Sequence, residues 1–169
     1  MKEKMILNKK IYRWILEISI ILIVLLAVRF WMQRDVVTGV APNINAVTLN
    51  GQLFELYKDQ RRPILVHFWA TWCPVCKLEQ SNIESTAKDY PVITIAMQSG
   101  HNEELIQFMQ NEKLSFDVIN DESGEISRSY NIRGVPVSFI INQENKIEFV
   151  EVGYTTEFGL RMRLWWAGL

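Results

Sequence analysis

The chain has 169 residues and a formal net charge of -1, from 18 basic and 19 acidic residues. This length suits one ordinary domain with a short appendage. The near-neutral charge gives no electrostatic basis for binding nucleic acid, so that class of partner is excluded. Hydrophobic residues make up 49% of the chain, and part of this excess is concentrated in one N-terminal segment.

The N-terminal apolar segment spans residues 11–32 and reads IYRWILEISIILIVLLAVRFWM. It has about the length, roughly 20 residues, that a helix needs to cross a bilayer. Trp14 and Trp31 lie near its ends, where aromatic rings favour the membrane interface. Basic residues are concentrated before it, so the positive-inside rule predicts a cytoplasmic N-terminus. A cleaved signal peptide is the alternative, but no small-residue cleavage site follows the segment.

These features predict three parts of the chain. Residues 1–33 form a cytoplasmic tip and a transmembrane anchor, residues 34–41 form a linker, and residues 42–169 form one folded domain. The protein is then a single-pass protein of the inner (cytoplasmic) membrane. Its domain is expected in the periplasm or another extracytoplasmic space.

The domain is predicted to alternate strands and helices. Asn50-Gly51 is a strong hairpin signal and predicts that residues 46–49 pair with residues 53–56. The continuous apolar run at residues 63–70 predicts a strand buried on both faces. The later elements are expected in chain order as a helix over 73–88, a strand over 92–97, a helix over 101–112, a strand over 115–120, a short helix over 123–132, strands over 134–142 and 146–153, and a helix over 157–166 capped by Thr156. This order implies an α/β fold, a three-layer sandwich around a central mixed sheet.

The two cysteines of the chain, Cys73 and Cys76, lie in the stretch HFWATWCPVCKLEQ. A structural disulfide here would enclose two residues and gain little entropy. A zinc site needs about four ligands, and the remaining candidates are His67 and His101. We therefore favour a redox pair over a structural disulfide or a metal site.

The sequence around the pair predicts different roles for the two thiols. A buried strand leads into C-x-x-C, so Cys73 is expected at a helix N-terminus, where free N–H groups and the helix dipole stabilise a thiolate. We predict that Cys73 is an exposed nucleophile and that Cys76, one turn further, is buried and resolves the mixed disulfide. The intervening Pro74-Val75 offers a single N–H, so fewer donors can reach the Cys73 sulfur.

Two motifs then resemble a known family. ILVHFWATWCPVC resembles the active-site strand and motif of thioredoxins, and RGVP resembles their cis-proline loop. APNINAVTLNGQLFEL and the helix after Met97 are similar to the membrane-anchored TlpA-like branch, which includes ResA and DsbE. HFWATWCPVCKLEQ, IAMQSG, RGVPVSF and GYTTEFGLRMRLWWA look most like suppressor-of-copper-sensitivity D proteins, a group of periplasmic protein disulfide oxidoreductases linked to copper tolerance. The resemblance covers about residues 42–169 and implies a thioredoxin-like fold.

The resemblance implies roles for several residues. Cys73 and Cys76 form the redox-active disulfide, and Pro136 is cis and faces it. Val135 offers its backbone to an incoming substrate strand. The substrate-binding residues are expected to be Trp72, Pro74, Val75 and Val135. We expect no cofactor and no metal.

Two further residues are candidates for handling the proton of Cys76. His67 lies where thioredoxins have a buried aspartate, and it either accepts this proton or is a core histidine bonded to backbone, the alternative that we favour. Glu79 matches an acidic position near the active site of ResA-like proteins and lies one helical turn after Cys76. The alternative for Glu79 is a solvated helix glutamate.

The last helix carries a group of aromatic residues whose role the sequence leaves open. Trp165 and Trp166 could contact the membrane or a partner. Their helical spacing with Phe158 and Met162 favours core packing for at least one of them. Arginines 161 and 163 are expected on the solvated face.

The sequence therefore predicts a membrane-anchored extracytoplasmic thiol-disulfide oxidoreductase, and more specifically a reductase of protein disulfides. Its partners would be substrate proteins with disulfides or thiols and a membrane electron donor of the DsbD/ScsB type. A copper-handling protein or metallochaperone with a thioredoxin fold is the alternative, although such proteins use C-x-x-x-C and a histidine, and His101 is expected in a surface loop. A cytochrome c maturation thioredoxin is less favoured, because Val137 replaces the acidic residue typical of that branch.

Overall fold

The computed structural model describes residues 13–24, 27 and 36–169. The chain divides into two compact units, with the boundary between Asp35 and Val36. In the first unit, residues 13–24 and residue 27 are helical and their side chains are exposed. Within the described ranges, no helix is both long enough and apolar enough to span a membrane. The anchor predicted over residues 11–32 lies in part outside the described residues.

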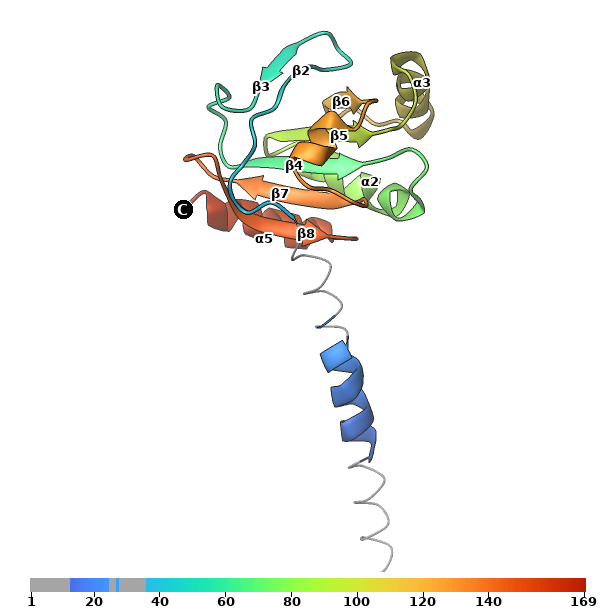
Figure 1. Cartoon of the computed structure of the whole chain (residues 1–169), viewed down its shortest axis with the longest axis vertical. Coiled ribbons are helices and arrows are strands. Elements are labelled where there is room, and N and C mark those ends of the chain that lie inside the picture. Colours follow the sequence, from blue (N-terminus) through green and yellow to red (C-terminus); the bar gives the residue numbers. More distant parts are fainter. Residues whose placement is uncertain (1–12, 25–26, 28–35) are drawn as a thin grey trace, which may run out of the picture. The chain divides into compact units, whose positions relative to one another are not determined.

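The second unit is built on a six-stranded mixed sheet (Figure 1). Strand β4 is parallel to β5, and β5 is parallel to β6, whereas β4–β7, β7–β8 and β8–β1 are antiparallel. The predicted mixed sheet is confirmed. In spatial order the strands are β1 (Gly39–Val40), β8 (Lys146–Val152), β7 (Val137–Ile141), β4 (Ile64–Trp69), β5 (Val92–Met97) and β6 (Val118–Asp121).

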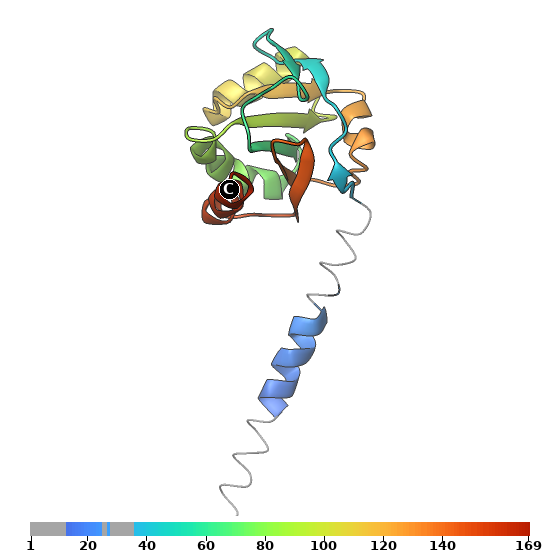
Figure 2. The same ribbon diagram turned by 90° about the vertical axis from the view of Figure 1, so that its left-hand side faces the viewer.

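Helices cover both faces of the sheet and complete three layers (Figure 1 and Figure 2). The apolar core on one face includes residues of α2, α3 and α5, and α2 lies beside α5. The core on the other face is covered by α4 and by the hairpin β2–β3. The bounds are α2 (Pro74–Thr86), α3 (Asn102–Glu112), α4 (Glu125–Ser129), α5 (Glu157–Ala167), β2 (Asn45–Val47) and β3 (Leu53–Glu55).

The central strand β4 shows why the sheet is buried on both faces. All six of its residues are buried. Val66 and Phe68 belong to the core beneath the hairpin, whereas Leu65 and Trp69 belong to the core beneath α2. Because strand side chains alternate between faces, His67 also lies on the α2 side. The continuous apolar run therefore produces the central strand that the sequence predicted.

The N-terminal part of the domain agrees with the sequence except at one edge. The hairpin β2–β3 forms around Asn50-Gly51, where Gly51 has φ +77°, a conformation that glycine adopts without strain. Two residues of the predicted linker, Gly39 and Val40, instead form edge strand β1 against β8. This pairing brings the start of the domain into the main sheet.

The predictions for α5 were wrong about which side chains face the core. Phe158, Met162, Trp165 and Trp166 are all at least half exposed. Leu160 and Leu164 fill the core instead, because they form the apolar stripe that faces α2 and the sheet. Helical spacing alone defines both stripes, so it could not identify the buried one.

The two arginines of α5 are likewise not on a freely solvated face. Arg161 forms ion pairs of 2.7 Å with Asp89 and with Glu157. Arg163 forms an ion pair of 2.7 Å with Glu151 of β8. Each guanidinium is about 30% exposed, so both side chains lie against the protein at the borders of the buried stripe.

Candidate active site

The cysteine pair lies where the central strand meets a helix. Strand β4 ends at Trp69, and a short loop leads to Cys73, the N-cap residue of α2, followed by Pro74 in its first turn. Proline is favoured there because its missing N–H would have no helical partner. Cys73 and Cys76 are joined by a disulfide. The predicted helix start and the predicted pairing both agree with the structure.

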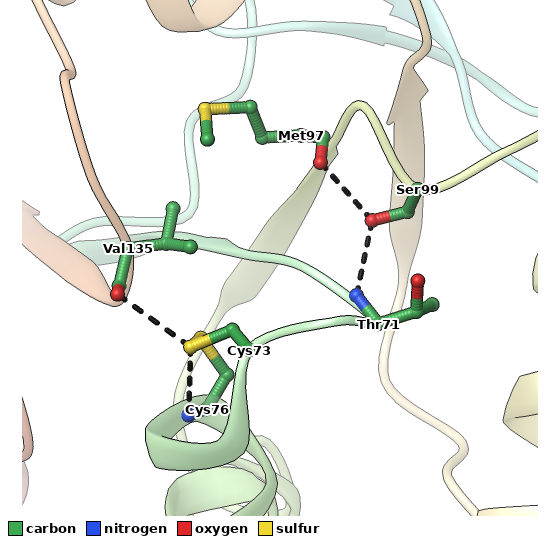
Figure 3. The surroundings of a disulfide bond; sticks show 6 residues. All are labelled: Thr71, Cys73, Cys76, Met97, Ser99 and Val135. Atoms are coloured by element: carbon green, nitrogen blue, oxygen red, sulfur yellow. Dashed lines mark hydrogen bonds between the residues drawn. A yellow bond between two sulfur atoms is a disulfide. The ribbon is translucent and has the colours of Figure 1, made fainter.

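One backbone donor reaches the sulfur of Cys73. The Cys76 N–H donates to Cys73 Sγ over 3.1 Å, in the manner of a helix N-cap (Figure 3). The N–H groups at a helix N-terminus favour negative charge on such an acceptor. The same geometry would therefore stabilise a Cys73 thiolate once the disulfide is reduced.

The prediction that Cys73 is exposed was wrong for the disulfide form. Cys73 is 4% exposed and Cys76 is fully buried. The cover comes from the loop before β7, since Val135 packs against the core that contains both cysteines. Cys73 Sγ lies 3.5 Å from the carbonyl oxygen of Val135 (Figure 3). Cys73 is still the more accessible of the two residues, as its predicted role requires.

The loop over the disulfide has the predicted cis-proline. The Val135-Pro136 peptide bond is cis, and Pro136 is buried. The Gly153 N–H donates to the Pro136 carbonyl over 2.9 Å, which ties this loop to the end of β8. The carbonyl of Val135 points toward Cys73 (Figure 3), so the backbone predicted to receive a substrate strand lies beside the predicted nucleophile.

A second loop holds the segment before Cys73 in place. The Thr71 N–H donates to Ser99 Oγ over 3.1 Å, and Ser99 donates to the carbonyl of Met97 over 3.1 Å (Figure 3). The indole N–H of Trp72 donates to the carbonyl of Gln98 over 3.1 Å. Sequence reasoning did not identify Ser99 or Gln98 as site residues. The signal was available, because the ends of adjacent parallel strands meet at one edge of a sheet.

Exposed apolar side chains flank the disulfide. Trp72 is 59% exposed and Val75 is 39% exposed, and Pro74 between them is also exposed. Leu78, one turn after Val75, is 71% exposed and was not among the predicted substrate-binding residues. Substrate binding by Trp72, Pro74, Val75 and Val135 remains a prediction, and the structure places all four near the disulfide.

Glu79 is not a solvated helix glutamate. Its side chain is fully buried on α2, one turn beyond Cys76. The Thr155 N–H donates to its Oε1 over 3.2 Å, and Oε2 is buried with no hydrogen-bond partner among the described residues. Burial raises the pKa of Glu79 to about 7, the nearby Glu151 adds to the rise, and the Thr155 N–H opposes it. A carboxyl group with this pKa can exchange a proton at neutral pH.

His67 is a buried core histidine. It is 2% exposed, and burial lowers its pKa to about 3, so the imidazole is neutral at physiological pH. Its Nδ1 lies 2.8 Å from the hydroxyl oxygen of Ser138 on β7. Its partner is thus a side-chain hydroxyl rather than the backbone group that we expected. The predicted proton transfer with Cys76 has no support from these contacts.

His101 lies apart from the cysteine pair. It is the N-cap residue of α3, and its Nδ1 is 2.8 Å from Glu122 Oε1. The side chain is 73% exposed, which agrees with the predicted surface position. In the part of the chain that the structure describes, no group of three or more histidine, cysteine, aspartate or glutamate residues could hold a metal ion.

Comparison with known families decides the family. The profile of the AhpC/TSA family matches residues 37–150. The chain belongs to the AhpC/TSA family. A thioredoxin-like protein of Haemophilus influenzae is 30% identical over 161 residues, which are 94% of this chain and 96% of that protein. The thiol-disulfide oxidoreductase ResA of Bacillus subtilis is 27% identical over 88% of this chain and 90% of its own length.

A solved structure of a similar protein has the same fold as this chain. StoA of Bacillus subtilis superimposes with a TM-score of 0.64 at 27% identity, over 73% of this chain and 96% of StoA. The predicted thioredoxin-like fold and family are therefore confirmed. With the disulfide at the N-terminus of α2, these relatives identify a protein-disulfide oxidoreductase. The closer resemblance to suppressor-of-copper-sensitivity D proteins remains a prediction.

Proposed function

We propose that this oxidoreductase is a membrane-anchored reductase of protein disulfides that acts outside the cytoplasm. The observation that carries the disulfide-exchange chemistry of this proposal is the arrangement around Cys76. Its sulfur is buried behind Cys73, and a buried carboxyl group with a pKa of about 7 lies one helical turn away at Glu79. This arrangement suits a resolving thiol that must lose its proton only after the substrate is bound.

The reaction begins with the reduced protein. The Cys73 thiolate attacks one sulfur of a substrate disulfide, and a mixed disulfide forms while the other substrate sulfur leaves as a thiolate. The Cys76 thiol then gives its proton to the Glu79 carboxylate and attacks the sulfur of Cys73. This step forms the Cys73–Cys76 disulfide and releases the second substrate thiol. Two electrons have passed from the protein to the substrate.

The site contributes stabilisation at each stage. The N–H of Cys76 and the N-terminus of α2 stabilise the Cys73 thiolate. Val135 and the exposed apolar side chains of Trp72 and Val75 offer a backbone and an apolar surface to an extended substrate segment. Glu79 holds the proton of Cys76 away from bulk water, because its side chain is fully buried.

The proposed location and direction of electron flow rest on different support. The apolar segment at residues 11–32 and the basic residues before it support an anchor with a cytoplasmic N-terminus. Such an arrangement puts the disulfide outside the cytoplasm, where protein disulfides form. A reductase there needs electrons from a membrane protein, and we propose a donor of the DsbD/ScsB type.

Serine variants of the two cysteines test the order of attack. Cys76→Ser should accumulate mixed disulfides with substrate proteins, because the resolving thiol is lost. Cys73→Ser should form none and should lose insulin reduction. Non-reducing electrophoresis of full-length protein isolated from cells separates these outcomes. Insulin reduction that survives Cys73→Ser would refute the mechanism.

A further inference from the structure

An ion pair between β8 and α5 includes Glu151, whose charge acts on the buried carboxyl group of Glu79. Glu151, near the end of β8, has a side chain that is 10% exposed, and its Oε1 is 2.7 Å from Nη2 of Arg163 on α5. The other terminal nitrogen of Arg163 donates to the carbonyl of Gly159 over 2.9 Å. The guanidinium therefore joins the end of strand β8 to the first turn of α5.

The segment between the end of β8 and the start of α5 also contacts Glu79. Thr155 lies four residues after Glu151, and its N–H donates to Glu79 Oε1. Thr156 then caps α5 through the N–H of Gly159. Glu79 thus contacts the short connection between β8 and α5, and Arg163 contacts the two elements that flank it. The negative charge of Glu151 is close enough to Glu79 to disfavour ionisation of its carboxyl group.

We propose that Glu151 and Arg163 form a positioning pair that controls when Glu79 can accept the proton of Cys76. This inference rests on the proposed function, in which Glu79 takes that proton. Neither residue touches the reacting sulfurs. The negative charge of Glu151 disfavours ionisation of Glu79, and the positive charge of Arg163 weakens this effect.

The other titratable groups around Glu79 leave this control to the pair. Cys76 lies on the same helix and is the proton donor. His67 on β4 lies on the sheet face that α2 covers, and it is neutral at physiological pH. Arg161, on α5, is held by Asp89 and Glu157 at the opposite border of that helix. Glu151 on β8 is therefore the charge that acts on Glu79, and Arg163 on α5 is its ion-pair partner.

Removal of the positive charge of Arg163 and removal of the negative charge of Glu151 should shift the titration midpoint of Glu79 in opposite directions. R163Q removes the positive charge that lies 2.7 Å from Glu151, so the titration midpoint of Glu79 should rise by roughly one pH unit. In E151Q the charge that disfavours ionisation of Glu79 is lost, so the midpoint should fall. In the double variant E151Q/R163Q the midpoint should stay close to that of E151Q, because loss of Arg163 has little effect once the charge of Glu151 is absent. If Glu151 and Arg163 had a merely structural role, both single variants would shift the midpoint of Glu79 in the same direction.

The measurement is a pH titration of the Glu79 carboxyl 13C resonance in the full-length disulfide form held in nanodiscs. The resonance is assigned by its loss in E79Q. R163K keeps the charge and should keep the midpoint, which separates charge from packing if R163Q folds poorly. R161Q is the matched control, since Arg161 lies on the same helix with similar exposure, and it should cause no shift.

Two outcomes would overturn the inference. One is an unchanged midpoint in both R163Q and E151Q, and the other is a shift of the same sign in both. The proposed function is tested separately by resolution of a preformed mixed disulfide in E79Q. If E79Q resolves at the wild-type rate, the proton role of Glu79 fails, whatever the ion-pair variants show.

Discussion

Glu79 and His67 are both buried on the α2 side of the sheet, and burial acts on them in opposite directions. Burial disfavours the charged form of each group, so it raises the pKa of the carboxyl group and lowers that of the imidazole. Near pH 7 the carboxyl group can gain or lose a proton, whereas the imidazole stays neutral. The candidate for proton transfer that the structure supports is therefore Glu79.

The raised pKa of Glu79 predicts a pH-dependent effect on stability. The ordinary value is 4.5 and the folded value is about 7, so the folded protein binds the extra proton between these pH values. Stability contributed by the neutral carboxyl group is thus complete below about pH 4.5 and is lost as the pH rises to about 7. E79Q should gain stability over wild type across this window, on the order of 3 kcal/mol by pH 8.

Urea unfolding of wild type and E79Q, both in the disulfide form, at pH 4.5 and at pH 8 measures this gain. The comparison of the same two proteins at two pH values removes any constant effect of the glutamine. A stability difference that does not change with pH would show that the carboxyl group is not destabilised by ionisation in the folded state.

The hydrogen bond between His67 and Ser138 predicts a purely structural variant. Ser138→Ala leaves a buried imidazole nitrogen without its partner, which should lower the free energy of unfolding by about 1–3 kcal/mol. The pH profile of disulfide exchange between pH 6 and 9 should keep its shape, because His67 is neutral throughout. A displaced profile in this variant would instead assign His67 to proton transfer.

At the level of elements, the site depends on two loops that meet the N-terminus of α2. One is the cis-proline loop at Val135-Pro136, and the other follows β5 and includes Ser99. Ser99 accepts from Thr71 and donates to Met97, so it fixes the approach to Cys73 from the neighbouring strand. Both loops belong to strands next to β4, which explains their convergence.

Ser99→Ala is expected to loosen the segment before Cys73. It removes two hydrogen bonds and should cost about 1–2 kcal/mol of stability. The rate of insulin reduction should fall several-fold, since the orientation of Cys73 is less restricted. Ser129→Ala is a control away from the cysteine pair, because the exposed Ser129 donates one bond to the carbonyl of Ile126 within α4. Equal loss of rate in both variants would contradict the role of Ser99.

Elements with a strong local signal could be predicted from the sequence. Asn50-Gly51 determined the hairpin, and continuous apolar runs determined β4 and β5. The helix start at Cys73 followed from the strand that leads into the C-x-x-C motif. The cis state of Pro136 was expected through resemblance alone.

Features that depend on distant contacts could not be predicted. The cover over Cys73 comes from Val135, 62 residues later in the chain. The burial of Glu79 depends on Thr155 and the start of α5. The choice between the two apolar stripes of α5 depends on which one meets α2 and the sheet. Strand β1 has two residues and no local pattern, and pairing with β8 alone defines it.

At the scale of the whole molecule, the proposed role requires a steady supply of electrons. The disulfide that forms after each turnover must be reduced again before Cys73 can attack another substrate. The proposed anchor at residues 11–32 would keep the domain close to a membrane donor. A reductase and an oxidant can share every element of this fold, and they differ in the relative stability of the dithiol and disulfide forms.

The most direct test is the reduction potential of the Cys73–Cys76 couple against glutathione, together with its redox state in cells. We predict a potential in the range of thioredoxin, about -270 mV, and mainly the dithiol form in cells. For this two-electron couple, 30 mV corresponds to roughly 1.4 kcal/mol, so the potentials of reductases and of strong oxidants are well separated. A potential near that of strong oxidants, about -120 mV, with mainly the disulfide form in cells, would contradict the proposed reductase.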